Sequence, residues 1–300
     1  RELDDLIIMR ADGTPTYNFG VVVDDWDMKI SHVIRGDDHV NNTPRQINII
    51  NALDFATPEY GHLSMILGPD GERLSKRHGA LGVEAYREAG YLPEAILNYL
   101  CRLGWSHGDH EFFSMEQAIS WFDGSSIGRS PARFDMQKLI SVNAYWLKKQ
   151  STKSIYEQIL RNHRQKSGKP ISNAFETRFN KLHPHFTKKA SIISELLSQI
   201  DYLLYDGAPE IADEVKAIIT ENSRTILKSF SNIVDETPLN SEAFESFINS
   251  WLKEKGLIMK DLGIPLRITL TGNKSAPTIF DLVQSLGFEE VKVRIQQICN

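Results

Sequence analysis

Residues 29–39 read KISHVIRGDDH, and this stretch decides the fold class. Apolar and polar residues alternate over its first six positions, which is typical of a strand, and a polar loop follows. A helix is predicted next, with Thr43 as its N-cap, Pro44 at its first position and Gln46 three residues after the cap. Strand, loop and helix in this order indicate an α/β fold.

The segments on either side of this stretch extend the pattern. Residues 3–10 predict a short apolar strand that an Asp-Gly turn closes. The valines at 21–23 favour a strand by propensity, but the spacing around them also fits a helix, and the sequence leaves both open. Residues 62–67 predict a second strand, which a turn at 68–71 and a basic tip at 73–77 follow.

Helical periodicity dominates the rest of the chain. Two boundaries are expected, one near residue 65, where strands and helices stop alternating, and one near residue 148, where a basic helical part begins. The predicted fold is an α/β remnant followed by helical regions, and is mainly α overall. The predicted helical segments are 92–100 with a stop near Gly104, 115–122, 155–160, 192–202, 211–219, 244–252 and 278–286 with Gly287 as C-cap.

The composition is that of a globular protein. Hydrophobic residues make up 41% of the chain and charged residues 24%, which excludes disorder and disulfide scaffolds as descriptions of the whole chain. No apolar run approaches the ~20 residues that a membrane span needs. The two isolated cysteines, Cys101 and Cys299, are too few for a zinc site or a disulfide framework. We therefore expect a protein of the reducing cytoplasm, without a membrane partner and without a metal site of its own.

The net charge of −5 conceals a gradient along the chain. Residues 1–150 carry 15 Lys and Arg against 21 Asp and Glu, whereas residues 151–200 carry 9 against 3. The basic part either follows an RNA backbone or forms a solvated helix surface over an aromatic core, and composition favours neither. Its cations are Lys148, Lys149, Lys153, Arg161, Arg164, Lys166, Lys169, Lys188 and Lys189, and its aromatic residues are Tyr156, Phe175, Phe179 and Phe186.

Two features could bind charged ligands. The basic tip carries three cations, which suit a polyphosphate whose charge grows during phosphoryl or nucleotidyl transfer, although a solvated hairpin tip would look the same. Arg35 lies at the carboxyl end of the predicted strand, where the ligand crevice of an α/β sheet is found, and its guanidinium suits a carboxylate. The alternative for Arg35 is a structural ion pair with one of its acidic neighbours, Asp24, Asp25, Asp37 or Asp38.

Two further patterns are weak. Asp37, Asp38 and His39 form one contiguous triplet, which lacks the spacing of a metal-ligand set, and roles in the loop and the helix entry are favoured. His62 follows Gly61, but no second histidine stands two positions upstream, so a phosphate-binding histidine pair is rejected.

A series of motifs occurs along the chain at residues 14–19, 23–25, 31–39, 42–46, 74–77, 90–100, 103–106, 265–267 and 270–272. In this order the motifs resemble the bacterial glutamyl-tRNA synthetase family. The resemblance covers essentially the whole chain and is weakest between about residues 150 and 255.

The resemblance implies a catalytic role for the basic tip. In that family the tip corresponds to the second signature of class I synthetases, here Arg-Leu-Ser-Lys-Arg, so Arg73, Ser75, Lys76 and Arg77 are the implied catalytic residues. Lys76 would neutralise the phosphates of ATP, and Leu67 would also contact ATP. Arg73 stands where the family usually has lysine, which keeps the charge but replaces a point charge with a planar fork.

The resemblance also implies a substrate site. Arg35 and Tyr17 would bind glutamate, with Arg35 facing a carboxylate of the substrate. Asp38 and His39 would line the pocket for the adenylate or for the acceptor end of tRNA, and Asn18 would support its wall.

The implied function is ATP- and Mg²⁺-dependent activation of glutamate to glutamyl-adenylate, followed by its transfer to the 3′ end of tRNA(Glu), in a monomeric cytoplasmic enzyme. The implied regions are the second half of a Rossmann-like catalytic domain (1–65), a stem-contact region (66–148) and a helical anticodon-binding domain (149–300). The first signature of the family, His-x-Gly-His, does not occur in the chain. We therefore expect Arg1 to mark a cut and the chain alone to be inactive.

Two rival functions stay open. One is a shorter paralogue that glutamylates a modified tRNA base, against which the helical residues after Lys149 weigh. The other is a tRNA-binding module without catalytic activity, which Arg35 and the basic tip do not exclude.

Overall fold

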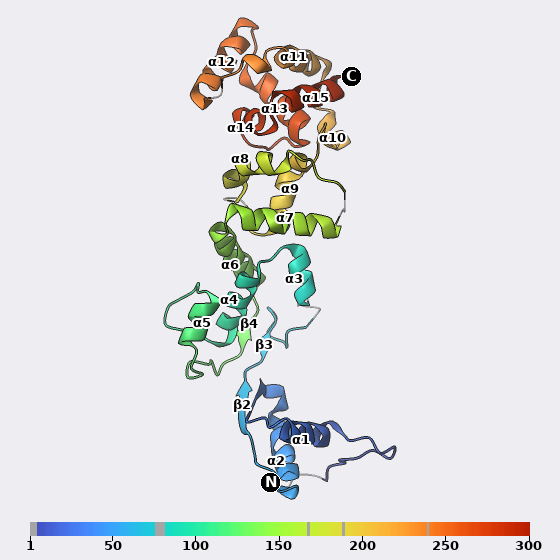
Figure 1. Cartoon of the computed structure of the whole chain (residues 1–300), viewed down its shortest axis with the longest axis vertical. Coiled ribbons are helices and arrows are strands. Elements are labelled where there is room, and N and C mark those ends of the chain that lie inside the picture. The colour runs from blue at the N-terminus through green and yellow to red at the C-terminus, as the bar shows by residue number, and fades with distance from the viewer. Residues whose placement is uncertain (1–4, 76–81, 167–168, 188–189, 239) are drawn as a thin grey trace. The chain divides into compact units, whose positions relative to one another are not determined.

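The computed structural model describes residues 5–75, 82–166, 169–187, 190–238 and 240–300. The chain forms two compact units, which Figure 1 colours in chain order. The first unit contains Arg1–Gly82 and Pro93–Val142, and the second contains Val83–Leu92 and Asn143–Asn300. A short segment between two parts of the first unit therefore belongs to the second unit by its contacts.

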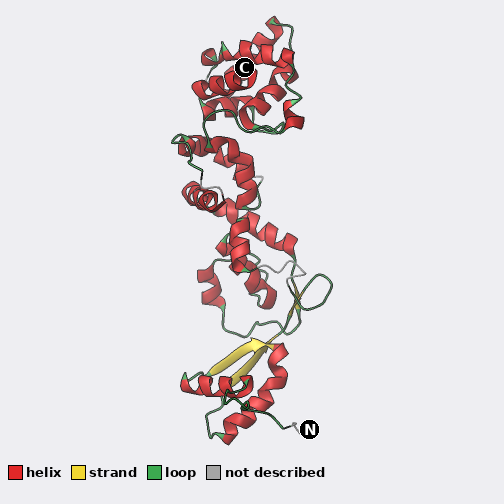
Figure 2. Cartoon of the chain, turned by 90° about the vertical axis from the view of Figure 1, so that its right-hand side faces the viewer, coloured by secondary structure: helices red, strands yellow, loops and turns green. Residues whose placement is uncertain are grey.

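The first unit holds two small parallel sheets beside helices, and Figure 2 shows the larger sheet in yellow. Strand β1 pairs with β2, with Arg35 opposite His62, and the short strand β3 pairs with β4. Its elements are α1 (Tyr17–Asp27), β1 (His32–Gly36), the 3-10 helix η1 (Asp37–Asn42), α2 (Thr43–Ala52), β2 (Glu59–Leu63), β3 (Ile66–Leu67), α4 (Pro93–Gly104), α5 (Met115–Trp121), β4 (Ala132–Arg133) and the start of α6 (Met136–Lys149).

Helices α1 and α2 pack against each other and form a small core. Val22 is buried with Ile49 and Ile50, and Phe19 and Phe55 lie against them. This packing decides the ambiguous valine run in favour of a helix, because burial against a neighbouring helix outweighs a weak intrinsic preference for strand.

Three local predictions need correction. Residues 5–10 form no strand, because Met9 makes a single bridge to Pro15 and no longer ladder is available. Residues 62–67 contain the end of one strand and the whole of another, since β2 ends at Leu63 and β3 is Ile66–Leu67. Thr43 is the first residue of α2 and not its N-cap. The cap is Asn42, whose backbone is already helical because η1 runs directly into α2, so no side chain caps the helix.

The second unit is built from helices around a core of aliphatic and aromatic side chains, which confirms that the chain is mainly α. At α14 the predicted signals hold, since the Thr278 hydroxyl accepts a hydrogen bond from Asp281 N and Gly287, with φ of +83°, ends the helix. Its elements are α3 (Val83–Ala89), the second half of α6, α7 (Thr152–Lys166), α8 (Phe175–Thr187), α9 (Ile193–Leu204), α10 (Asp213–Lys216), α11 (Glu221–Ser231), the 3-10 helix η3 (Val234–Glu236), α12 (Ser241–Glu254), α13 (Met259–Thr271), α14 (Ile279–Leu286) and α15 (Phe288–Cys299).

Two buried arginines fix the turn that follows α9. Arg294 of α15 is fully buried, donates to the carbonyl oxygen of Tyr205 at 2.9 Å and pairs with Glu290 at 2.7 Å. Arg178 of α8 is 5% exposed, donates to the same carbonyl oxygen at 3.2 Å and pairs with Asp206 at 2.7 Å. The turn therefore joins α8, α9 and α15 through charged hydrogen bonds.

Candidate functional site

Arg35 is the centre of the candidate substrate site in the first unit. Strand β1 places it beside His62 of β2, and its guanidinium lies over the ring of Tyr60, with 5.3 Å to the ring centroid. Its Nη2 donates to Thr43 Oγ1 at 2.8 Å and to the carbonyl oxygen of His39 at 3.4 Å, and its Nε lies 3.5 Å from His62 Nε2. The side chain is therefore held by neutral acceptors and an aromatic ring.

The structure answers the alternative for Arg35 that the sequence left open. Within the described residues, Arg35 forms no ion pair with any carboxylate. The charge of Arg35 does act on Asp25: burial raises the pKa of the Asp25 carboxyl, and the positive charge of Arg35 opposes this rise. A half-buried guanidinium with neutral partners is suited to a substrate carboxylate.

The structure places Tyr17 near His39, whose carbonyl oxygen accepts from Arg35. Tyr17 is 55% exposed, and its ring centroid lies 5.9 Å from that of His39. Asn18, predicted to support the wall, accepts a hydrogen bond from Gln46 Nε2 at 3.0 Å. This bond links α1 to α2, and since Gln46 is buried, it lies beneath the surface of the site.

Asp38 is engaged by the basic tip. Its carboxylate lies 3.2 Å from Arg73 Nη2 and 4.0 Å from His39 Nε2. Arg73 is presented by a tight hairpin, in which Leu74 N donates to the carbonyl oxygen of Ile66 at 2.9 Å. Two residues that the sequence assigned to different parts of the site therefore meet at its edge.

Of the other residues that the resemblance assigns to catalysis or to ATP, the structure describes Ser75 and Leu67. Ser75 is the last described residue before a gap, and Lys76 and Arg77 lie outside the described residues. Leu67 lies in β3, where its carbonyl oxygen accepts from Phe134 N at 2.8 Å and its backbone bridges to Arg73.

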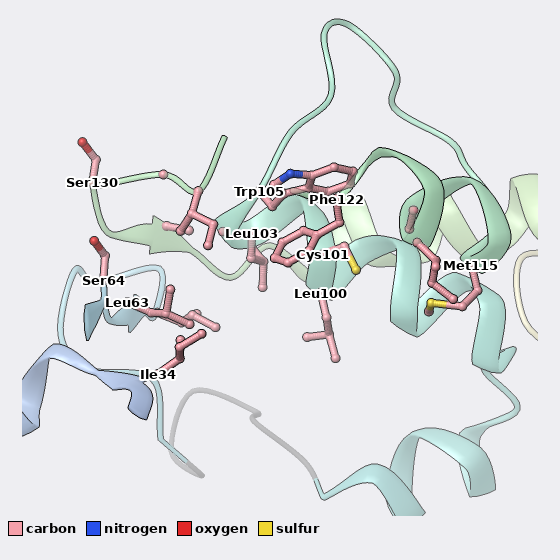
Figure 3. A pocket seen from close by; sticks show the side chains of 17 residues that line it. Ile34, Leu63, Ser64, Leu100, Cys101, Leu103, Trp105, Met115, Phe122 and Ser130 are labelled. Carbon is pink, nitrogen blue, oxygen red and sulfur yellow. The ribbon is translucent and has the colours of Figure 1, made fainter. Parts of the chain in front are cut away.

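An apolar pocket of about 550 Å³ occurs elsewhere in the first unit, and sequence reasoning missed it. Figure 3 shows Ile34 and Leu63 of the strands, with Leu100, Met115 and Phe122 of the helical part, among the side chains around this space. Ile34 alternates with Arg35 along β1, so the pocket and the candidate substrate site use opposite faces of the sheet. The signal in the sequence was the excess of apolar residues on α4 and α5 beyond what one buried stripe requires.

The second unit has a smaller pocket of about 440 Å³ between α8, α9 and the loop before α14. Phe186, Tyr202, Asn273 and Pro277 are among its lining residues. The hydroxyl of Tyr202 is buried and has no hydrogen-bond partner among the described residues. Burial raises the pKa of this hydroxyl, which therefore stays protonated and can donate.

The basic part has exposed cations over an aromatic core. Lys148, Lys149, Lys153, Arg161 and Arg164 are exposed on α6 and α7. The aromatic residues are not interleaved with them on the surface. Phe175, Phe179 and Phe186 are buried, and Tyr156 stacks on the first of them with 5.5 Å between ring centroids.

No helix in the described part of the chain is both long and apolar enough to span a membrane. Among the described residues, no three His, Cys, Asp or Glu side chains converge in a way that could hold a metal ion.

Comparison with known families divides the chain into two regions. The profile of the class I tRNA synthetases for E and Q, catalytic domain, matches residues 1–141. The profile of the anticodon binding domain matches residues 148–299, about half of the chain.

Individual relatives agree with these profiles. The glutamate–tRNA ligase of Bordetella parapertussis is 46% identical over 299 residues, which cover 99% of this chain and 61% of the relative. The glutamate–tRNA ligase of Nitrosomonas eutropha is 44% identical over 295 residues, covering 98% of this chain and 63% of the relative. The chain thus spans a little over three fifths of the length of these curated relatives.

Solved structures show the same similarity. A glutamate tRNA ligase from Elizabethkingia meningosepticum, in complex with its amino acid, superposes with a TM-score of 0.76 at 28% identity, covering 99% of this chain and 62% of that one. The glutamate–tRNA synthetase of Elizabethkingia anophelis gives a TM-score of 0.74 at 28% identity, with the same coverage. Profiles, relatives and fold agree: the chain belongs to the class I tRNA synthetases for E and Q with their anticodon binding domain, and it is similar over nearly its whole length to glutamate–tRNA ligases.

Proposed function

We propose that this chain supplies the glutamate subsite and the tRNA-binding helices of a glutamate–tRNA ligase. In the proposed reaction a carboxylate oxygen of glutamate attacks the α-phosphorus of ATP and pyrophosphate leaves. A ribose hydroxyl at the 3′ end of tRNA(Glu) then attacks the activated carbonyl carbon, and AMP leaves. Catalysis of this kind rests on positioning and on cations placed where negative charge develops.

The observation that carries the proposal is the state of Arg35. Its guanidinium is held in place by Thr43 and His39 and has no carboxylate partner among the described residues. A substrate carboxylate would complete its coordination. Tyr17, which is exposed beside His39, would lie against the same substrate.

Arg73 and the residues after it are proposed to face the phosphates of ATP. The ion pair between Arg73 and Asp38 would hold the start of the basic tip at the edge of the site. Leu67 and Ser75 are proposed to contribute to the ATP site, as are Lys76 and Arg77, which lie outside the described residues. The described residues offer no ligand cluster for Mg²⁺, and we propose that the ion arrives with the phosphates of ATP, as it commonly does.

The second unit is proposed to bind tRNA(Glu). Its support is the match of the anticodon-binding profile and the row of exposed cations on α6 and α7. The pocket beside Tyr202 has the mixed aromatic and polar lining that a single nucleobase requires. The same match weighs against the shorter paralogue that modifies a tRNA base.

Glutamate-dependent ATP–pyrophosphate exchange in the presence of tRNA(Glu) tests the activity. The chain alone should show no turnover, whereas a longer protein that joins the chain to the part of a relative that it does not match should be active. In that longer protein, Arg35→Gln should raise the KM for glutamate about 100-fold, because a charge-assisted pair is lost. Arg10→Gln, at an exposed arginine, is the control. Equal KM values for the two variants would refute the assignment of Arg35.

Filter binding of a tRNA(Glu) transcript across a salt series tests the RNA surface. Replacing Lys148, Lys149 and Lys153 together by Gln should weaken binding and flatten the slope of log Kd against log salt by about 3, one for each phosphate contact. The control replaces the exposed Lys216, Lys253 and Lys260 of α10, α12 and α13 in the same way. An unchanged slope in the first variant would count against this surface.

A further inference from the structure

The segment Val83–Leu92 depends on the second unit for its position. Helix α3 has only seven residues, none of which is buried, whereas Gly90 and Leu92 after it are buried. A helix of this length is not stable by itself in water. Contacts at its C-terminal end must therefore hold it.

Gly90 lies directly against the N-terminus of α9. Its φ is +90°, and a Cβ at this position would lie 2.8 Å from both Ile193 Cβ and Ser194 N, so no residue with a side chain fits. The carbonyl oxygen of Gly90 accepts a hydrogen bond from Ile193 N at 3.0 Å. The N-cap residue of α9, Ile192, provides no side-chain acceptor, so Gly90 satisfies an amide that would otherwise lack a partner.

Asn143 of α6 joins the same two segments with one side chain. It is fully buried, its Oδ1 accepts from Leu92 N at 2.8 Å, and its Nδ2 donates to the carbonyl oxygen of Ser191 at 2.5 Å. Asn162 of α7 adds a weaker contact, from its Nδ2 to the carbonyl oxygen of Glu88 at 3.4 Å. The backbone on both sides of Gly90 is thus tied to α6, α7 and α9.

The helices that hold this segment also carry the proposed RNA surface. Asn143 lies on α6 together with Lys148 and Lys149, and Asn162 lies on α7 beside Arg161. A phosphate backbone bound to these cations would restrain the helices that provide the anchor. In the sequence, five residues separate Arg77, the last residue of the basic tip, from Val83, so the anchor holds a segment that begins shortly after the tip.

We propose that Asn143 and Gly90 form an anchor through which α6, α7 and α9 position Val83–Leu92, and that RNA bound to the second unit restrains this segment through the anchor. Asn143 is thus a positioning residue, which acts on the segment after the basic tip. The coupling to RNA rests on the proposed function, whereas the anchor itself is a property of the chain alone.

Hydrogen–deuterium exchange of the full chain, with and without a tRNA(Glu) transcript, tests both parts. Without RNA, Asn143→Ala should speed exchange in 83–92 and 190–195 about tenfold, because a buried hydrogen bond to each segment is lost. The matched control is Asn98→Ala in α4. Asn98 is also buried and donates to a backbone carbonyl, that of Glu111, and its loss should affect only the first unit.

With RNA, the wild type should show slower exchange in 83–92 and in α7. In Asn143→Ala the RNA affinity should stay within twofold and α7 should still be protected, but protection of 83–92 should be lost. Asn143→Asp keeps the acceptor for Leu92 N and should restore part of this protection, which a general loss of stability would not allow.

Three results would overturn the inference. These are unchanged exchange in 83–92 for Asn143→Ala without RNA, a uniform increase over the whole chain, and full protection of 83–92 by RNA in that variant. If RNA binds the wild type without protecting 83–92, the coupling fails while the proposed function stands. If RNA does not bind at all, the proposed function fails and the coupling with it, and the exchange without RNA still decides the anchor.

Discussion

Glu290 is the charged partner on which the buried arginines of the second unit depend. Its Oε1 accepts from Arg294 Nε at 2.7 Å and from Gly207 N at 2.8 Å, and its Oε2 lies 3.7 Å from Arg178 Nη2. Arg294 is fully buried and Arg178 nearly so, whereas the other carboxylate of the cluster, Asp206, has a 62% exposed side chain. Burial lowers the pKa of Arg294, and the hydrogen bond and charge of Glu290 oppose this.

Glu290→Gln should therefore strongly destabilise the protein. The change preserves the size of the side chain but removes the charge, leaving two buried guanidinium groups with one exposed carboxylate. Removing one partner of a buried ion pair typically costs about 3–5 kcal/mol. The hydrogen bonds that Glu290 accepts from Arg294 and Gly207 give a similar loss of stability. A hydrogen bond to a charged group contributes roughly 1.5–3 kcal/mol, and the amide oxygen of Gln would keep part of each.

Urea denaturation followed by far-UV circular dichroism at pH 7 measures the effect, because the second unit is built from helices. Glu289→Gln is the matched control. The neighbouring Glu289 has a 92% exposed side chain and pairs only loosely with Lys292 at 3.9 Å, so its loss should change stability by less than about 0.5 kcal/mol. A loss of under about 1 kcal/mol in Glu290→Gln would refute the reasoning, because the buried charges would then not depend on this carboxylate.

Three further outcomes are expected. Gly272→Ala should lower the free energy of unfolding, measured by urea denaturation, by about 2–4 kcal/mol, because the φ of Gly272 is +75° and a Cβ would lie 2.8 Å from a backbone oxygen. The control Gly256→Ala, with φ of +69° and open space around the Cβ, should lower it by about 1 kcal/mol. Burial raises the pKa of Asp206, but hydrogen bonds from Ser172 and the neighbouring arginine outweigh it and leave the pKa below its ordinary value. The charged form therefore stabilises the fold above about pH 4, and this contribution disappears as the pH falls through the lowered pKa, so stability measured against pH should fall less steeply below pH 4 in Asp206→Asn. Tyr202→Phe should raise the urea midpoint slightly, because it removes a buried hydroxyl that has no hydrogen-bond partner among the described residues. In filter binding the same variant should bind tRNA(Glu) up to about tenfold more weakly. Unchanged binding would show that Tyr202 is not part of the proposed RNA site.

Only part of the candidate substrate site follows from local patterns in the sequence. The alternation before Arg35 predicted its strand, whereas Tyr17 and His39 were assigned by the family resemblance, and the structure places the ring of Tyr17 near that of His39, whose carbonyl oxygen accepts from Arg35. The partners of Arg35 could not be predicted, because the sequence indicates that Thr43 is an N-cap and gives His62 no role once a phosphate-binding histidine pair is rejected. Both come next to Arg35 only when β1, β2 and the start of α2 are assembled.

The aromatic residues of the basic part show the same limit. The sequence left two interpretations open, because cations and phenylalanines at helical spacing give the same pattern whether the rings are exposed on the surface or buried in the core. Packing placed Phe175 and Phe179 in the core and left the cations on the surface. Burial depends on which helices meet, which no local window contains.

The sequence by itself determined the family motifs, the charge gradient, the position of Arg35 at the end of a strand and most helices, because these depend on residues close together in the chain. Only the tertiary structure decided that Val83–Leu92 belongs to the second unit, that Asn143 and Gly90 hold it there, and that Glu290 serves two buried arginines. Each of these contacts joins residues that are far apart in the chain. A hydrogen bond or an ion pair acts over a few ångströms, so such partners are fixed by packing and not by local sequence.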